Sequence, residues 1–264
     1  MARIECEFFS EVLVKNMTMS VILPQKGKFY PESESAADRY PTLFLLHGFS
    51  DNHMTWLQNT SLERYAADYR LAIVMPSADN SYYNDMANGS KYWTYLTEEI
   101  PAAARSFFPL SEKREDNFVA GHSMGGFGAL KWGLNYPEQF AAVASLSGVT
   151  DMVFHLERAR PFAADKYKSL SLAFGEETII HTANDILWLL EQTDRLHEKK
   201  PMLYQACGTE DFLHEHNMRF FRTCKKTGVD LTTNFGPGEH SWDYWDDQIR
   251  EVLQWLRINV NPKV

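Results

Sequence analysis

Short apolar segments alternate with longer amphipathic segments along most of the chain. The apolar segments are near-continuous or rich in β-forming residues and are bounded by Gly, Pro or His, which is typical of strands buried on both faces of a sheet. They cover residues 42–46, 71–75, 117–120, 140–146, 201–206 and 231–235. The segments between them have helical periodicity, over residues 61–69, 94–108, 124–135, 212–227 and 243–258. This alternation predicts an α/β fold, with a mostly parallel sheet and helices on both of its faces.

Three segments depart from the alternation. In residues 12–23 apolar and polar side chains alternate with one slip, which predicts a half-buried antiparallel strand at an edge of the sheet. The polar stretch 27–40 predicts a surface loop. Residues 150–200 contain helical pieces, such as 184–196, but no clear strand. We expect an insert there that forms a lid or a pocket wall, within a single domain over residues 1–264.

The composition argues against several classes of function. The chain has 264 residues with 26 basic and 35 acidic side chains, so its formal net charge is −9. We expect no nucleic-acid partner and no membrane, because this charge opposes binding to phosphate backbones and anionic lipids. Cys6, Cys207 and Cys224 are too few and too widely spaced for a disulfide framework or a zinc site, which favours a reducing compartment. With no signal-peptide pattern and no apolar run near the roughly 18 residues of a membrane span, we expect a cytoplasmic protein.

The strongest chemical signal is the sequence Gly121-His-Ser123-Met-Gly125. It follows a predicted strand and precedes a predicted helix, which is the context that the G-x-S-x-G nucleophile elbow requires. A serine on so sharp a turn needs strained backbone angles, and the glycines avoid collisions around it. The turn presents the hydroxyl above the sheet, where helix N–H groups face a developing oxyanion. Ser123 is therefore the candidate nucleophile.

A serine nucleophile needs a general base, and the base needs an orienting acid. In elbow-containing folds the chain order is Ser, then acid, then His, each in a loop after a strand. Asp211 and His240 occupy these places, after the strands predicted at 201–206 and 231–235. Glu210, which precedes Asp211, is an alternative acid. The competing histidines are His47, His53, His122, His155, His181, His197, His214 and His216.

The oxyanion hole of such a site needs two N–H donors. The first candidate is the N–H of Met124, which follows the nucleophile. The second is the N–H of Phe49, because the strand 42–46 runs directly into His47-Gly48 and the next N–H can point into the site. We expect His47 to hold this loop in place rather than to act in the chemistry.

Aromatic residues of two segments are candidates to line a substrate pocket. The loop at residues 77–94 is rich in aromatic side chains, and Trp242 lies two positions after His240. Trp93 and Trp242 are the candidate substrate contacts, because aromatic walls suit short acyl or phenolic groups. The alternative is that these rings cover the edge of the sheet.

No metal site and no cofactor is expected. His214 and His216 are close in sequence, but residues two apart on a helix face different directions, and no third ligand follows at metal spacing. We expect both on the solvated surface of a helix. A serine mechanism needs only water to release the acyl group, so it requires no cofactor.

With these features in place, the chain resembles an α/β-hydrolase of the esterase D group, which includes S-formylglutathione hydrolases, feruloyl-esterase-like enzymes and short-chain (tributyrin) esterases. The resemblance rests on four sequence motifs: Leu45-Leu-His-Gly-Phe-Ser-Asp-Asn52, Ala120-Gly-His-Ser-Met-Gly-Gly126, Cys207-Gly-Thr-Glu-Asp-Phe212 and Gly238-Glu-His-Ser-Trp242. It is most similar to bacterial tributyrin esterases, whose catalytic serine, aspartate and histidine fall on Ser123, Asp211 and His240. S-formylglutathione hydrolases usually carry His where Phe127 stands and a cysteine shortly after the His-Gly of the oxyanion loop. The resemblance therefore favours a simple carboxylic ester over formylglutathione.

The motifs and the resemblance imply a serine carboxylesterase that hydrolyses short-chain acyl esters through a Ser-His-Asp triad and an acyl-enzyme. Among enzymes, the alternatives are a feruloyl or acetyl-xylan-type esterase, an S-formylglutathione-hydrolase-like thioesterase, a peptidase and a metal-dependent hydrolase. Outside enzymes, the alternative is a binding module built on a hydrolase fold. The expected partner is a small-molecule ester, and the resemblance alone implies a homo-oligomer.

Overall fold

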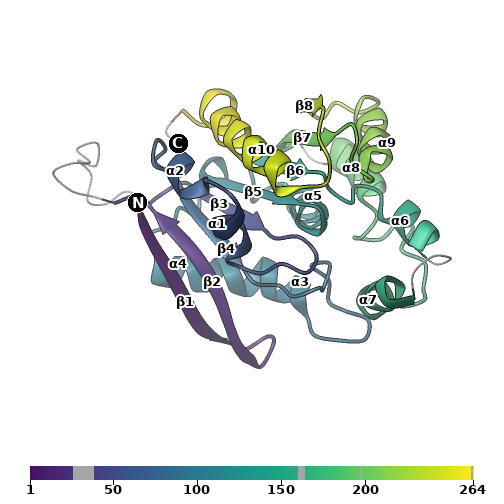
Figure 1. Ribbon diagram of the computed structural model, residues 1–264, viewed down its shortest axis with the longest axis horizontal. Coiled ribbons are helices and arrows are strands. Elements are labelled where there is room, and N and C mark those ends of the chain that lie inside the picture. The colour runs from purple at the N-terminus through teal and green to yellow at the C-terminus, as the bar shows by residue number, and fades with distance from the viewer. Residues whose placement is uncertain (26–38, 160–163, 197, 263) are drawn as a thin grey trace.

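Eight strands form one sheet in the computed structural model, which describes residues 1–25, 39–159, 164–196, 198–262 and 264 (Figure 1). The order across the sheet is β1-β2-β4-β3-β5-β6-β7-β8. β1 pairs antiparallel with β2 and β2 with β4, whereas every other neighbouring pair is parallel. The strands are β1 (Ala2–Ser10), β2 (Lys15–Leu23), β3 (Thr42–Leu46), β4 (Ala72–Pro76), β5 (Asn117–His122), β6 (Ala142–Leu146), β7 (Met202–Gly208) and β8 (Leu231–Gly236).

The predicted α/β fold is confirmed, but the edge of the sheet was wrongly assigned. The edge strand is β1, and β2 begins only at Lys15 because the preceding residues form the turn between the two strands. Val14 adopts a positive φ of 54° in that turn, which explains the slip in the alternation. β1 itself alternates between half-buried and exposed side chains, so the same period-two signal was present there.

Helices cover both faces of the sheet, as predicted (Figure 1). One face packs against α1, α2 and α10 through buried side chains such as Trp56, Leu62 and Ile249. The other packs against α4, α5, α8 and α9 through side chains such as Ile100, Leu130 and Phe220. The helices are α1 (Thr55–Asn59), α2 (Leu62–Ala66), α3 (Tyr92–Thr94), α4 (Ile100–Phe107), α5 (Met124–Asn135), α6 (Met152–Ala159), α7 (Ala164–Phe174), α8 (Ile186–Leu196), α9 (His214–Cys224) and α10 (Trp242–Trp255), with π-helical segments η1 (Tyr95–Glu99) and η3 (Leu256–Val260) and the 3₁₀ turn η2 (Arg114–Asp116).

The segment between β6 and β7 contains helices α6, α7 and α8, and its described part contains no strand. α8 packs beside α5 and α9, so this helix belongs to the layer that covers the sheet. The end of α7 bonds instead to the loop before α3, where Ala87 N–H donates to Ala173 O at 3.2 Å and Asn88 N–H to Leu172 O at 3.0 Å. The predicted loop at 27–40 falls almost entirely outside the described residues.

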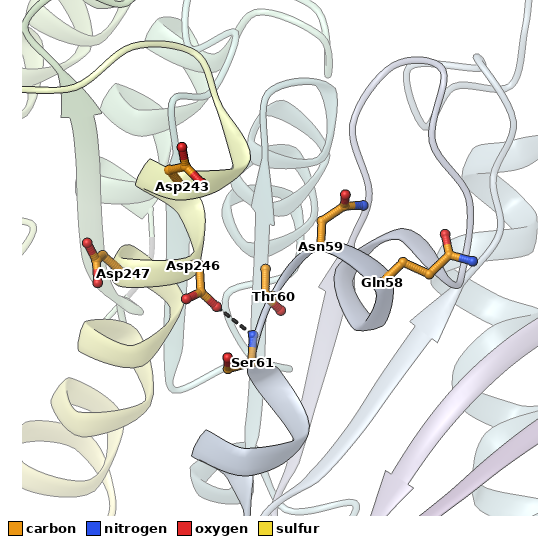
Figure 2. Close-up of a pocket in the computed structure, with 7 residues that line it drawn as sticks. All are labelled: Gln58, Asn59, Thr60, Ser61, Asp243, Asp246 and Asp247. Carbon is orange, nitrogen blue, oxygen red and sulfur yellow. Dashed lines mark hydrogen bonds between the residues drawn. The ribbon is translucent and has the colours of Figure 1, made fainter.

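The N-terminal end of α10 is anchored to α2 by Asp246. Its Oδ1 accepts the Ser61 N–H at 2.6 Å and its Oδ2 accepts the Tyr65 hydroxyl at 2.7 Å. Figure 2 shows this carboxylate beside Ser61 in an open groove lined by the end of α1, the residues between α1 and α2, and the start of α10, with Asp247 pointing away from Ser61. A carboxylate at the N-terminal N–H groups of a helix is stabilising, so this contact stabilises the start of α2 and ties it to α10. In the described ranges, no helix is long and apolar enough to cross a membrane.

Candidate active site

Ser123 lies on a strained turn between β5 and α5. Its backbone angles are φ 53° and ψ −116°, in a region that residues with a side chain rarely adopt. A methyl group on Gly121 would overlap the backbone of Gly125, and one on Gly125 would overlap the backbone of Leu46. The two glycines therefore let the chain turn tightly enough to raise the serine hydroxyl above the end of the sheet.

Ser123, His240 and Asp211 form one hydrogen-bonded chain. His240 Nε2 lies 2.9 Å from Ser123 Oγ, and His240 Nδ1 lies 2.8 Å from Asp211 Oδ2 and 3.0 Å from its Oδ1. The residues follow β5, β8 and β7, whose carboxyl ends meet at one edge because the strands are parallel. The structure thus brings together all three residues that the sequence singles out.

Asp211 is the acid that contacts the histidine, and Glu210 is not. The Asp211 side chain is buried, and its Oδ1 also accepts the Leu213 N–H at 2.8 Å. Burial opposes ionisation of this carboxyl, but hydrogen bonds from His240 and Leu213 outweigh it and lower the pKa of Asp211. Glu210 instead accepts the Gly238 N–H at 2.7 Å and the Thr209 hydroxyl at 2.8 Å. Asp211 is therefore held ionised where it can orient an imidazole.

Among the histidines of the described residues, only His240 hydrogen-bonds to Ser123. His197 lies outside those residues. The expectation that His214 and His216 form a solvated surface is wrong for His216, which is only 4% exposed. α9 packs against the segment after β6, where Thr150 donates to His216 O at 2.7 Å and His216 Nδ1 lies 3.2 Å from Asp151 O.

The N–H groups of Met124 and Phe49 are the candidate oxyanion donors. Met124 is the first residue of α5, so its N–H has no partner within the helix. The Phe49 N–H donates no hydrogen bond to another described residue. His47 Nδ1 lies 2.8 Å from Gly48 O, and His47 Nε2 accepts the Ala78 N–H at 2.9 Å. Because C=O and N–H of one trans peptide point in opposite directions, fixing Gly48 O also fixes the Phe49 N–H.

Burial keeps His47 in the neutral form that this arrangement needs. The ring is fully enclosed, and desolvation lowers its pKa to about 4. A neutral ring donates from one nitrogen and accepts at the other, which matches the two bonds that it makes. The predicted role of His47, holding the loop, agrees with these contacts.

The two candidate substrate contacts lie in different surroundings. Trp93 stacks on Tyr136 at 6.0 Å and lies under the Lys131 ammonium, near the far end of α5 from the elbow. Trp242 lies at the start of α10, and its ring packs 4.6 Å from that of His122, the residue before Ser123. Of the two, only Trp242 packs beside the elbow.

Sequence reasoning missed the rings that enclose His240. Phe212 is tilted against the imidazole at a centroid distance of 4.4 Å, and its side chain is 64% exposed. Trp245 lies edge-on to the same ring at 4.8 Å. The sequence could have indicated Phe212, because it directly follows Asp211. No neighbouring motif indicated that Trp245 would contact His240.

It also missed Lys131, a fully buried cation in α5. Its ammonium donates to Tyr83 O at 3.0 Å and to Asn84 Oδ1, and lies 4.1 Å from the Trp93 ring centre. Burial lowers the pKa of Lys131 to about 7. The Tyr83 hydroxyl in turn donates to His47 O at 2.8 Å, so Lys131 supports the loop that braces the Phe49 segment.

Several known proteins are similar to this chain over nearly its whole length. The family model described as "Putative esterase" matches residues 10–256. An acetyl esterase of Caldicellulosiruptor saccharolyticus is 33% identical over 265 residues, 97% of this chain and 98% of that protein. The fold matches substrate-bound FphF, a fluorophosphonate-binding serine hydrolase of Staphylococcus aureus, with a TM-score of 0.87, 34% identity and coverage of 97% and 98%. It also matches the S-formylglutathione hydrolase FrmB of the same species, with a TM-score of 0.83, 32% identity and the same coverage.

Proposed function

The chain belongs to the Esterase family of α/β-hydrolases and is a serine esterase, and from this premise we propose that it hydrolyses short-chain carboxylic esters through Ser123, His240 and Asp211. The observation that carries the proposal is the unbroken chain of hydrogen bonds from the hydroxyl to the carboxylate. A small-molecule ester is the expected substrate.

In the first half of the reaction Ser123 Oγ attacks the ester carbonyl carbon while His240 Nε2 takes the hydroxyl proton. The imidazolium that forms is stabilised by Asp211, which also keeps the proton on Nδ1 beforehand. Collapse of the tetrahedral intermediate breaks the carbon–oxygen bond to the alcohol, and His240 returns the proton to the leaving oxygen. Water then attacks the acyl-enzyme by the same route and releases the acid.

The negative charge of the intermediate falls on the former carbonyl oxygen. The N–H groups of Met124 and Phe49 are proposed as its two donors, since the Met124 N–H directly follows Ser123 without a partner in α5 and the Phe49 N–H donates to no other described residue. Removing one donor of this kind typically costs roughly 3–4 kcal/mol in transition-state stabilisation.

An aromatic cluster beside Phe49 supports a short acyl chain. The Tyr82 ring lies 5.9 Å from that of Phe49 and 5.6 Å from that of Phe174. Phe127 completes the cluster, 6.4 Å from Tyr82 and 6.1 Å from Phe174. Bulky rings next to the proposed oxyanion donor would restrict the acyl group to a small one, which agrees with the name of the acetyl esterase relative. Since Phe174 belongs to α7, the proposed pocket wall includes part of the insert over residues 150–200.

The nucleophile is tested with Ser123→Ala and a fluorophosphonate probe. We expect loss of p-nitrophenyl acetate and butyrate turnover and loss of covalent labelling, with an unchanged circular dichroism spectrum. Turnover close to that of the wild type in this variant would refute the assignment. A histidine base also requires activity to rise with pH between about 5 and 8.

Chain length is tested with p-nitrophenyl esters from acetate to octanoate. We expect kcat/KM to fall beyond butyrate, and Phe174→Ala to extend the range toward longer chains.

Trp242 is retained as a proposed substrate contact, whereas the packing of Trp93 on Lys131 and Tyr136 favours a structural role.

A thioester is the second candidate substrate, because the FrmB relative is an S-formylglutathione hydrolase. A comparison of kcat/KM for S-formylglutathione and p-nitrophenyl acetate separates the two. A higher value for the thioester would transfer the proposal to that substrate class without changing the roles of Ser123, His240 and Asp211.

A further inference from the structure

A buried histidine and a partly exposed carboxylate join the two segments that carry the proposed oxyanion donors. His122 Nε2 lies 2.9 Å from Asp51 Oδ2, and the two side chains are 1% and 18% exposed. We propose that His122 and Asp51 are positioning residues for the oxyanion hole, because their bond fixes the distance between the Phe49 N–H and the Met124 N–H. This inference rests on the proposed esterase mechanism and adds two residues to it.

The pair connects the ends of two neighbouring strands. Asp51 lies two residues after Phe49 in the loop that follows β3, and His122 lies two residues before Met124 at the end of β5. Within the loop, the Asp51 N–H donates to Gly48 O at 3.3 Å, so a hydrogen bond links Asp51 directly to the Gly48–Phe49 peptide. A displacement of Asp51 relative to His122 is therefore passed to the Phe49 N–H.

The imidazole also lies directly against the peptide that must be placed. A methyl group on Gly48 would approach His122 Nε2 to 2.5 Å and Asp51 Oδ2 to 3.0 Å. Glycine at this position lets the ring reach the loop backbone, one residue from the proposed donor. The His122 ring thus contacts the loop one residue from Phe49, and its own backbone lies two residues from Met124.

Three indole rings hold the His122 ring in one orientation. Its centroid lies 4.9 Å from that of Trp56, 4.6 Å from Trp242 and 4.3 Å from Trp245. His122 Nδ1 has no hydrogen-bond partner among the described residues. Burying an imidazole with one unpaired nitrogen costs free energy, whereas an aliphatic side chain would fill an aromatic box without that cost. The retained polar contact is the one with Asp51, which agrees with a function for that bond.

The pair acts without changing its charge. Burial lowers the pKa of His122 although Asp51 opposes this, so the ring is neutral and its Nε2–H donates to the carboxylate. Oxyanion donors act only when they lie about 2.7–3.1 Å from the developing charge. A misplacement of about 1 Å is enough to cost about 100-fold in rate, so a bond that fixes the two donors affects kcat more than substrate binding.

Asp51→Ala tests the proposal, because the partly exposed carboxylate can be removed without leaving a closed cavity. We expect kcat per active site to fall by about 30- to 100-fold while KM changes less than threefold. Asp51→Asn keeps an oxygen acceptor for Nε2–H and should recover most of the rate. The inhibition constant of a trifluoromethyl ketone, whose adduct places an oxyanion in the hole, should rise in parallel with the loss of kcat.

Glu5→Ala is the matched control. Glu5 is 62% exposed and accepts from His53 Nε2 at 3.3 Å, so this variant also removes the carboxylate partner of a histidine, but that bond does not reach the elbow. We expect its kcat to stay within twofold of the wild type. His122→Gln, which can still donate to Asp51, should retain more activity than His122→Leu.

A value of kcat per titrated site within threefold of the wild type in folded Asp51→Ala would overturn the proposal. A purely structural role would appear as a lower melting temperature and fewer titratable sites, with unchanged kcat per site and inhibitor affinity. If Ser123→Ala were active, the esterase mechanism would fail. If Ser123→Ala were inactive and Asp51→Ala normal, only the positioning role would fail.

Discussion

Replacing Asp211 by Asn should invert the tautomer of His240. Asp211 Oδ1 accepts the Leu213 N–H at 2.8 Å, and a buried N–H needs an acceptor. The oxygen of the new amide must therefore stay on Leu213, which leaves its NH₂ group facing His240 Nδ1 in the place of Oδ2. An NH₂ group donates, so Nδ1 would have to accept and the ring proton would move to Nε2.

That tautomer cannot take a proton from Ser123, because the Nε2–H would point at the hydroxyl oxygen. We expect kcat/KM for p-nitrophenyl acetate to fall by about 10⁴-fold at pH 7, or about 5 kcal/mol in transition-state free energy. The shape and volume of the side chain are unchanged, so the midpoint of urea unfolding should move little. Steady-state rates between pH 5 and 9, normalised to folded protein, measure the effect.

Glu210→Gln is the control for this change. Glu210 is adjacent in sequence but contacts Gly238 and Thr209, so we expect its substitution to change kcat/KM by less than threefold. A loss of less than tenfold in Asp211→Asn, or a larger loss in Glu210→Gln, would contradict the roles assigned to the two acids.

Three further predictions concern stability. Lys131 has a pKa of about 7 in the folded protein, whereas the ordinary value is 10.5. Between these two values the unfolded chain binds more protons, so the free energy of unfolding should rise with pH. When unfolding in urea is measured at several pH values, the slope of this free energy against pH should be smaller in Lys131→Met by about 1.4 kcal/mol per pH unit. His47 has a pKa of about 4 in the folded protein, whereas the ordinary value is 6.5. As the pH drops from 6.5 to 4, the wild type should therefore lose about 3 kcal/mol more unfolding free energy than His47→Asn. Equal acid sensitivity of the two proteins would count against a buried neutral His47. Gly133→Ala would place a methyl group on Val143 and should destabilise by about 1–3 kcal/mol despite the better helix propensity of alanine; a higher melting temperature would disprove this packing argument.

The central part of the fold and the three candidate catalytic residues could be predicted because their signals are local. The parallel strands are short apolar runs, and each of Ser123, Asp211 and His240 follows such a run. Parallel pairing then brings the ends of β5, β7 and β8 to one edge whatever the details of the connections. The predicted helix at 124–135 has the same bounds as α5, and the elbow accounts for its start.

Contacts between distant segments could not be predicted. No spacing in the sequence links Asp51 to His122, since their bond depends on how two loops approach above the sheet. The burial of His216 depends likewise on the packing of α9 against the segment after β6. The predicted helix at 94–108 is interrupted by the π-helical segment η1, because hydrophobic periodicity does not distinguish one extra residue per turn.

The position of Trp245 between two imidazoles gives this enzyme an internal optical probe. Its indole lies 4.3 Å from the His122 ring and 4.8 Å from the His240 ring. It is one of seven tryptophans in the chain. An excited indole transfers an electron to imidazolium far more readily than to neutral imidazole, so its emission dims when the neighbouring ring gains a proton. Burial disfavours the charged form of His122, so the response of Trp245 reports the protonation of His240. Once Trp188, which lies 6.0 Å from His181, is replaced by Phe, stopped-flow fluorescence could follow this proton in the unlabelled protein.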